Sequence, residues 1–150
     1  MIRTLAVLLA FSLLSACNSP YDAKHVHVSI VNALRASDRA LVTGCNTVVE
    51  RANYSPHQAI FIEDAAISQG FGYIRINNHL FRVALLKGST DGFHSLRSFA
   101  DPGGSLSVVE SFDIGTKHLD TGSTELTGEL TVTYDGVTET IPFGGGTAGC

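Results

Sequence analysis

The segment ELTVTYDGVTETI, residues 129–141, decides the fold because it holds the clearest hairpin signal in the chain. Its Asp135-Gly136 pair favours a type I′ turn, in which both central residues need positive φ. Such a turn pairs Tyr134 with Val137, and the alternation of side chains then gathers Leu, Val, Tyr and Ile on one face. The opposite face carries four threonines and is expected to contact solvent: Thr131, Thr133, Thr138 and Thr140.

The segment YIRINNHLFRVAL, residues 73–85, predicts a second hairpin. With Asn77 and Asn78 at its turn, four apolar side chains share one face: Ile74, Ile76, Phe81 and Val83. A register shifted by one residue would place Arg75 opposite Arg82, and like charges directly opposite each other destabilise a sheet. We therefore expect the register with the Asn-Asn turn.

Shorter signals fill the rest of the chain. Strands are expected at residues 45–49, 59–62 and 106–114, and turns at 89–92 and 101–104. Residues 63–70 suggest one helical turn that ends at Gly70. Short strands separated by turn residues in this way are typical of all-β domains. The expected fold class is therefore mainly β, a single antiparallel β-sandwich or small barrel.

Residues 24–42 allow two interpretations. Val26, Val28 and Ile30 alternate, and their β-branched side chains favour a strand through Val31. Much of the same stretch also fits one helical stripe, which predicts an α+β fold with an N-terminal helix around residues 24–42. We favour the strand and keep the helix as the alternative.

The first residues have the pattern of an export signal. Arg3 precedes an apolar run over residues 5–14, which is too short to span a bilayer and fits a cleaved signal peptide. The run ends in Leu14-Ser15-Ala16-Cys17, which resembles the lipobox of bacterial lipoproteins. The resemblance implies cleavage before Cys17 and attachment of lipid to its sulfur. No specific family is recognised for the rest of the chain.

A lipid anchor would set the location of the protein. Each buried methylene contributes about 0.8 kcal/mol, so two or three acyl chains hold a protein stably at a membrane. Asn18 is not the Asp that, in the sorting pattern this resembles, retains a lipoprotein at the inner membrane. We therefore expect the outer membrane. The chain then divides into a signal peptide at 1–16, a lipidated tether at 17–24 and one β-rich domain at 25–150.

The net charge and the cysteines indicate which partners and which covalent links to expect. Loss of Arg3 with the leader leaves nine basic residues against 14 acidic ones, a net charge of −5. A mildly acidic chain without a basic run argues against a nucleic-acid partner. Cys45 and Cys150 form an even pair in an exported protein, which predicts a disulfide.

Two histidines near the start of the domain are candidate metal ligands. His25 and His27 would share one face of a strand, where both imidazoles can bind Zn or Cu. A third ligand would have to come from a carboxylate or from another histidine, namely His57, His79, His94 or His118. Two exposed histidines on the outer face of a half-buried strand are the simpler explanation of the pattern. We therefore expect no cofactor, and keep a periplasmic metal-binding lipoprotein as the alternative function.

Two carboxylates interrupt apolar faces. Glu110 has the parity of its apolar neighbours in the strand at 106–114, and Glu139 lies among the inward residues of the first hairpin. Buried carboxylates with a raised pKa can act in acid–base catalysis. However, the Val108-Val109 doublet predicts a bulge that turns Glu110 outward, and Glu139 is expected past the edge of the core. Catalytic motifs such as G-x-S-x-G and H-E-x-x-H are absent, so we do not expect an enzyme.

One aromatic and basic group remains as a candidate protein contact. Phe71, Tyr73, Arg75 and Arg82 lie on the face of the Asn-Asn hairpin opposite its core side. Tyr, Phe and Arg are enriched at protein interfaces. A second layer over this face would instead make it core.

The predicted function is a lipid-anchored protein-binding, inhibitor or scaffold module with an envelope or extracellular protein as partner. Lysozyme-inhibitor and immunity lipoproteins are similar in size and leader, although their motifs are not found here.

Overall fold

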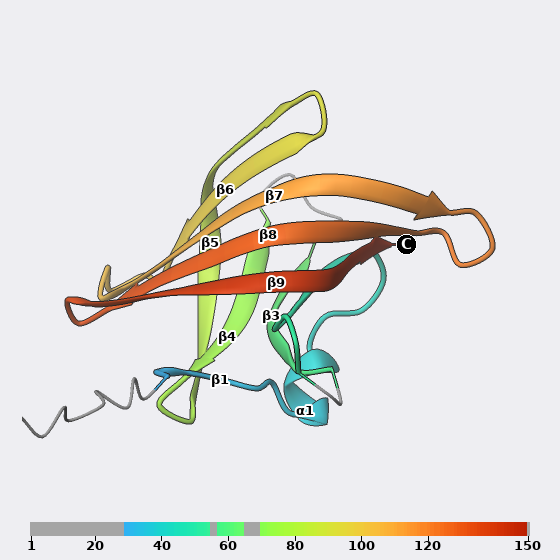
Figure 1. Ribbon diagram of the computed structural model, residues 1–150. Helices are drawn as coiled ribbons and strands as arrows, with labels where there is room; N and C mark the ends of the chain where they lie inside the picture. Colours follow the sequence, from blue (N-terminus) through green and yellow to red (C-terminus); the bar gives the residue numbers. More distant parts are fainter. Residues whose placement is uncertain (1–28, 55–56, 65–69, 150) are drawn as a thin grey trace, which may run out of the picture.

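The structure, a computed structural model, describes residues 29–54, 57–64 and 70–149. In this part of the chain eight antiparallel strands form a closed barrel (Figure 1). They are β2 (Asn46–Glu50), β3 (Ala59–Asp64), β4 (Phe71–Ile76), β5 (His79–Asp91), β6 (His94–Ala100), β7 (Leu106–His118), β8 (Ser123–Tyr134) and β9 (Val137–Gly149). Consecutive strands pair with each other from β2 to β9, and the pairing of β9 with β2 closes the barrel. The predicted β class and small barrel are confirmed.

The N-terminal part of the described chain adds one short strand and one short helix. β1 (Val31–Asn32) pairs with the end of β4, beyond the residues of β4 that pair with β3. α1 (Ala36–Arg39) follows it and has only four residues. The alternative of a long helix over 24–42 is therefore wrong for residues 29–42, because Val31 is buried in the core and pairs with Ile76. Residues 24–28 lie outside the described residues.

Both predicted hairpins form in the expected register. In β8–β9, Tyr134 pairs with Val137 and Leu130 with Ile141, and the turn residues Asp135 and Gly136 have φ of 47° and 80°. On the solvent face the threonines pair across the strands through their hydroxyls, at 3.1 Å for Thr131 and Thr140 and 2.9 Å for Thr133 and Thr138.

The β4–β5 hairpin turns at Asn77 and Asn78, with φ of 47° and 67°. Arg75 consequently lies opposite Leu80, and the two arginines are not paired. The positive φ at both turn residues is the type I′ geometry that asparagine tolerates better than most side chains. The local chemistry of the turn and the avoidance of like charges thus predict the same register.

The weaker predictions have mixed outcomes. β2, β3 and β7 confirm the three expected strands, and the turn at 101–104 forms, with the Asp101 carboxylate accepting a hydrogen bond from the Leu106 N–H at 2.7 Å. The turn expected at 89–92 is wrong, because Ser89 and Thr90 pair with Leu96 and Ser95 and the chain turns only after Asp91. Of the expected helical turn at 63–70, residues 63–64 belong to β3 and residues 65–69 lie outside the described residues.

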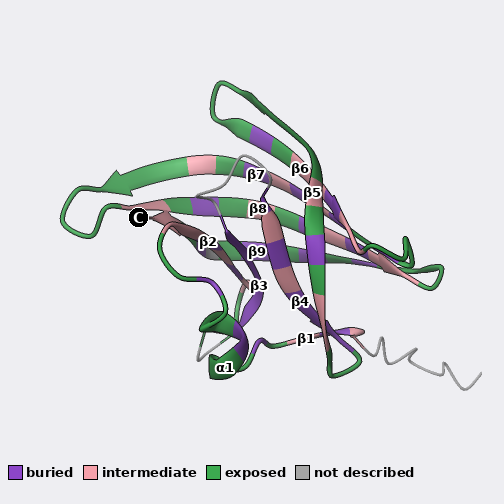
Figure 2. Ribbon diagram, turned by 180° about the vertical axis from the view of Figure 1, so that it is seen from behind, coloured by how far each residue is buried: buried purple, intermediate pink, exposed green. Residues whose placement is uncertain are grey.

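The barrel interior is filled by alternate residues of strands such as β7 and β8, along which buried positions alternate with more exposed ones (Figure 2). In β3 every residue is buried. Phe61 and Phe99 meet edge to face with ring centroids 5.2 Å apart. The Phe61 ring lies so close to Gly72 that a Cβ there would overlap it. Glycine at this position therefore makes room for the aromatic core, a device that lets a sheet curve tightly into a barrel.

A second, smaller cluster lies outside the barrel. Its buried members are Leu34, Val42, Ala59 and Ile62, and they pack against the partly buried Val48, Phe71, Tyr73 and Leu80. The segment around α1 therefore covers part of the outer face of β3 and β4. Within the described residues, no helix is long and apolar enough to cross a membrane.

Candidate functional site

Three of the four predicted contact residues form a cluster on the outer face of β4 and β5. Tyr73 lies opposite Arg82 in the register, and the Phe71 and Tyr73 rings meet edge to face at 5.6 Å. The Arg82 guanidinium carbon lies 4.3 Å from the centroid of the Phe71 ring, and Arg82 is exposed. We call Phe71, Tyr73 and Arg82 the aromatic patch.

Arg75 does not belong to this surface, which corrects the prediction from sequence. Its side chain is buried, and it donates to both carboxylate oxygens of Asp38 at 2.8 Å and to the carbonyl of Asn78. Asp38 lies in α1, so the covering segment reaches this end of the face. Burial works to raise the pKa of Asp38, but hydrogen bonds from the Arg35 N–H and from Arg75 outweigh it and lower that pKa.

A second layer covers only part of this face. The α1 segment buries Arg75 and half-buries Phe71, Tyr73 and Leu80, while Arg82 and Ala84 stay exposed. The α1 segment alone provides this second layer within the described residues, because the strands there form a single closed sheet.

Inside the barrel lies a charged cluster that sequence analysis only partly anticipated. Glu110 was expected to turn outward at a bulge, but the irregularity in β7 lies between Ile114 and Lys117 and Glu110 is fully buried. Neither of its carboxylate oxygens has a hydrogen-bond partner. Burial, assisted by the negative charge of Glu63 and opposed by Arg97, raises the pKa of Glu110 to about 8.

Glu63 and Arg97 complete this cluster. They form an ion pair, and Glu63 is almost fully buried while Arg97 is partly exposed. The Arg97 guanidinium also lies over the Phe112 ring, 5.3 Å from its centroid. Burial raises the pKa of Glu63 despite the opposing effect of Arg97. Sequence reasoning missed this pair, although Arg97 has the same parity as the buried Ser95 and Phe99 in β6.

Glu139 is also buried, and the expectation that it lies past the edge of the core is wrong. Its carboxylate accepts hydrogen bonds from the Ser29 hydroxyl at 2.7 Å and from the N–H groups of Ile30 and Val31 at 2.9 and 3.2 Å. Arg51 lies 3.7 Å from it. These bonds attach the start of β1 to β9, so the evident role of Glu139 is structural.

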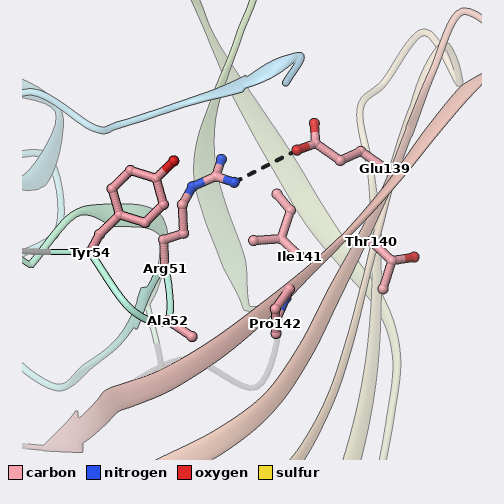
Figure 3. A pocket seen from close by; sticks show the side chains of 7 residues that line it. All are labelled: Arg51, Ala52, Tyr54, Glu139, Thr140, Ile141 and Pro142. Atoms are coloured by element: carbon pink, nitrogen blue, oxygen red, sulfur yellow. Dashed lines mark ion pairs between the residues drawn. The ribbon is translucent and has the colours of Figure 1, made fainter. Parts of the chain in front are cut away.

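A surface pocket of about 360 Å³ adjoins this carboxylate. Its lining residues are shown in Figure 3: Arg51, Ala52, Tyr54, Glu139, Thr140, Ile141 and Pro142. Arg51 donates to the Ser29 hydroxyl and the Val31 carbonyl at 3.0 Å each. The charged groups of the pocket are therefore engaged in holding β1, and the exposed residues of its wall are Tyr54, Thr140 and Pro142.

The histidine prediction falls mostly outside the structure, since His25 and His27 lie outside the described residues. The other histidines with ionic neighbours contact separate carboxylates: His57 with Glu50, His94 with Asp113 and His118 with Glu125. In the described ranges no three metal-binding side chains come together. A site built on His25 and His27 stays a prediction.

The register of β2 with β9 bears on the predicted disulfide. Asn46 pairs with Gly149 and Thr47 with Ala148, so the next antiparallel pair in sequence would be Cys45 with Cys150. Directly opposed residues have Cα atoms about 4.5–5.5 Å apart, a separation that a disulfide accommodates. Cys150 lies outside the described residues, and the bridge stays a prediction that this register supports.

Comparisons of the chain with known protein families, with curated proteins and with solved structures gave no match. The charged neighbours of Glu110 are Glu63 and Arg97, and those of Glu139 include Arg51. Within residues 29–54, 57–64 and 70–149, no hydrogen bond or ion pair joins either carboxylate to a histidine.

Proposed function

We propose that this protein is a bacterial envelope lipoprotein, anchored through Cys17, that binds an envelope or extracellular protein through the aromatic patch. The observation that carries the proposal is the ordered contact of Arg82 with Phe71 on the outer face of the barrel. Aromatic residues and arginine contribute most of the binding energy in many interfaces. A closed barrel holds such a surface rigidly, so little conformational entropy is lost on binding.

The charge of the patch favours an acidic partner segment. Arg82 is an exposed cation on a chain whose net charge is negative. Ala84, opposite Phe71, continues the exposed face along β5, and Leu86, which is 70% exposed, follows it. A partner segment with apolar side chains and a carboxylate would complement both the rings and the guanidinium.

The anchor would keep the patch near the membrane. Eleven residues lie between Cys17 and Ser29, and the twelve steps along the chain span at most about 40 Å when fully extended. The barrel therefore works close to the bilayer, where envelope proteins are concentrated. Residues 1–16 act as the signal peptide in this proposal, and the outer membrane is the proposed location.

Copurification from solubilised envelopes tests the binding function. We expect the wild-type protein to retain a partner that is lost with the double variant Phe71→Ala, Arg82→Glu. The matched control is Thr138→Glu, which adds a carboxylate to the exposed threonine face of β9. Equal recovery of the partner with the double variant and the wild type would refute the assignment of the patch.

Palmitate labelling tests the anchor separately. The wild type should incorporate the label and move with the membrane fraction, whereas Cys17→Ser should do neither. Absence of label on the wild type would refute the anchor and leave the binding test intact.

A further inference from the structure

Inside the barrel, the side chain of Arg97 lies near two buried carboxylates, those of Glu63 and Glu110. Arg97 is bonded to Glu63, while Glu110, fully buried, has no hydrogen-bond partner for either oxygen. Native proteins seldom leave a buried polar group without a partner, and such a group calls for an explanation.

The backbone register places Arg97 within reach of both carboxylates. Arg97 is the direct cross-strand partner of Glu110 in the β6–β7 ladder, and such pairs have Cβ atoms about 4.5–5.5 Å apart. Glu63 lies on β3, which is separated from β6 by β4 and β5 in the barrel order. The Arg97 guanidinium thus bonds to Glu63, three strands away, although Glu110 lies beside it on the neighbouring strand.

One guanidinium cannot neutralise two ionised carboxylates. A charged group buried without a partner is costly, so the cluster is stable when Glu110 holds a proton. The other charged groups that act here are Glu63, which raises the pKa of Glu110, and Asp64, which raises the pKa of Glu63. On β8 the residue opposite Glu110 is Leu130, which provides no countercharge.

We propose that Glu110 is a proton-binding site that controls the pairing of Arg97, so that loss of its proton to solvent draws Arg97 from Glu63 toward Glu110. The proton leaves from the carboxyl oxygen and no covalent bond other than that O–H bond is broken. The ion pair between β3 and β6 then weakens, because two carboxylates share one cation. Protonation of Glu110 restores it.

The ion pair lies close to the aromatic patch in the sheet. Glu63 pairs with Gly72, which lies between Phe71 and Tyr73 in β4. A change in the ion pair therefore occurs one strand from the aromatic patch.

Carboxyl and guanidinium NMR of the full isotope-labelled chain in detergent tests the proposal. We expect the Glu110 side-chain carboxyl carbon to titrate with a midpoint near pH 8, where burial places its pKa. The Arg97 Nε–H resonance should shift with the same midpoint. Glu110→Gln should abolish both titrations, and Glu129→Gln, at an exposed position of β8, should preserve both.

Either of two results would overturn the proposal. The first is a Glu110 midpoint near the ordinary value of 4.5. The second is an Arg97 resonance that stays constant while Glu110 titrates, since the proton would then not control the ion pair. Both midpoints are measured in the wild-type protein, so the test holds even if Glu110→Gln does not fold.

Discussion

Replacement of Glu110 by glutamine should change how the stability of the barrel depends on pH. The folded-state pKa of Glu110, about 8, lies above its ordinary value of 4.5. Between these two values the folded protein binds a proton that the unfolded chain does not, so the free energy of unfolding falls as pH rises. Below pH 4.5 and above pH 8 the protonation state of Glu110 is the same in both states, and its contribution is constant.

The size of the effect follows from the pKa values. Each pH unit in this window contributes about 1.4 kcal/mol, so the whole window of roughly 3.5 units amounts to about 5 kcal/mol. Glutamine has nearly the same shape and does not ionise. Relative to the wild type, Glu110→Gln should therefore be about equally stable at pH 4 and more stable by about 5 kcal/mol at pH 9.

Urea denaturation followed by far-UV circular dichroism, repeated from pH 4 to pH 9, measures this difference. Glu129→Gln is the matched control, because it removes an exposed carboxylate from the neighbouring strand. Its curve should run parallel to that of the wild type. Glu110→Leu should be stabilising even at pH 4, by about 1–2 kcal/mol, because it removes a buried polar group without a partner. Parallel curves for Glu110→Gln and the wild type would refute the reasoning.

Three further predictions concern contacts that hold the barrel together. Asp38→Asn leaves the buried Arg75 without its carboxylate, and the free energy of unfolding should fall by about 3 kcal/mol in urea denaturation. An unchanged midpoint would contradict this role of the pair. Glu139→Gln weakens the attachment of β1, so hydrogen exchange of the Ile30 and Val31 amides should become faster while that of the Thr140 amide does not. Reduction of the proposed bridge between Cys45 and Cys150 opens a loop of about 106 residues, and the chain-entropy relation gives a loss of roughly 4.7 kcal/mol. Titration of two free thiols in the unreduced native protein would exclude the bridge.

The hairpins were predictable because their signals are local. Asp135-Gly136 and Asn77-Asn78 adopt positive φ within a few residues of the strands that they connect. Alternation of apolar and polar side chains then defines the buried face of each hairpin. The sequence therefore predicted these registers and the mainly β class without any knowledge of distant contacts.

The candidate sites were predicted less completely, since each depends on a distant segment. The prediction that Glu110 turns outward was wrong, because the bulge expected at Val108-Val109 did not form and Glu110 kept the parity of its buried neighbours. Arg75 was assigned to the surface because nothing near it in sequence shows that Asp38 covers it. Partners separated in this way can be identified only when the chain has folded.

The sequence by itself determined the two hairpin turns, the alternating strands that they connect and the mildly acidic composition of the chain. Tertiary structure alone decided that the strands close into a barrel, through the pairing of β2 with β9 between residues about 100 positions apart. It also decided that Glu63, Arg97 and Glu110 share one interior. The physical reason is that strand periodicity arises from neighbouring residues, whereas barrel closure and shared countercharges arise between segments that only folding brings together.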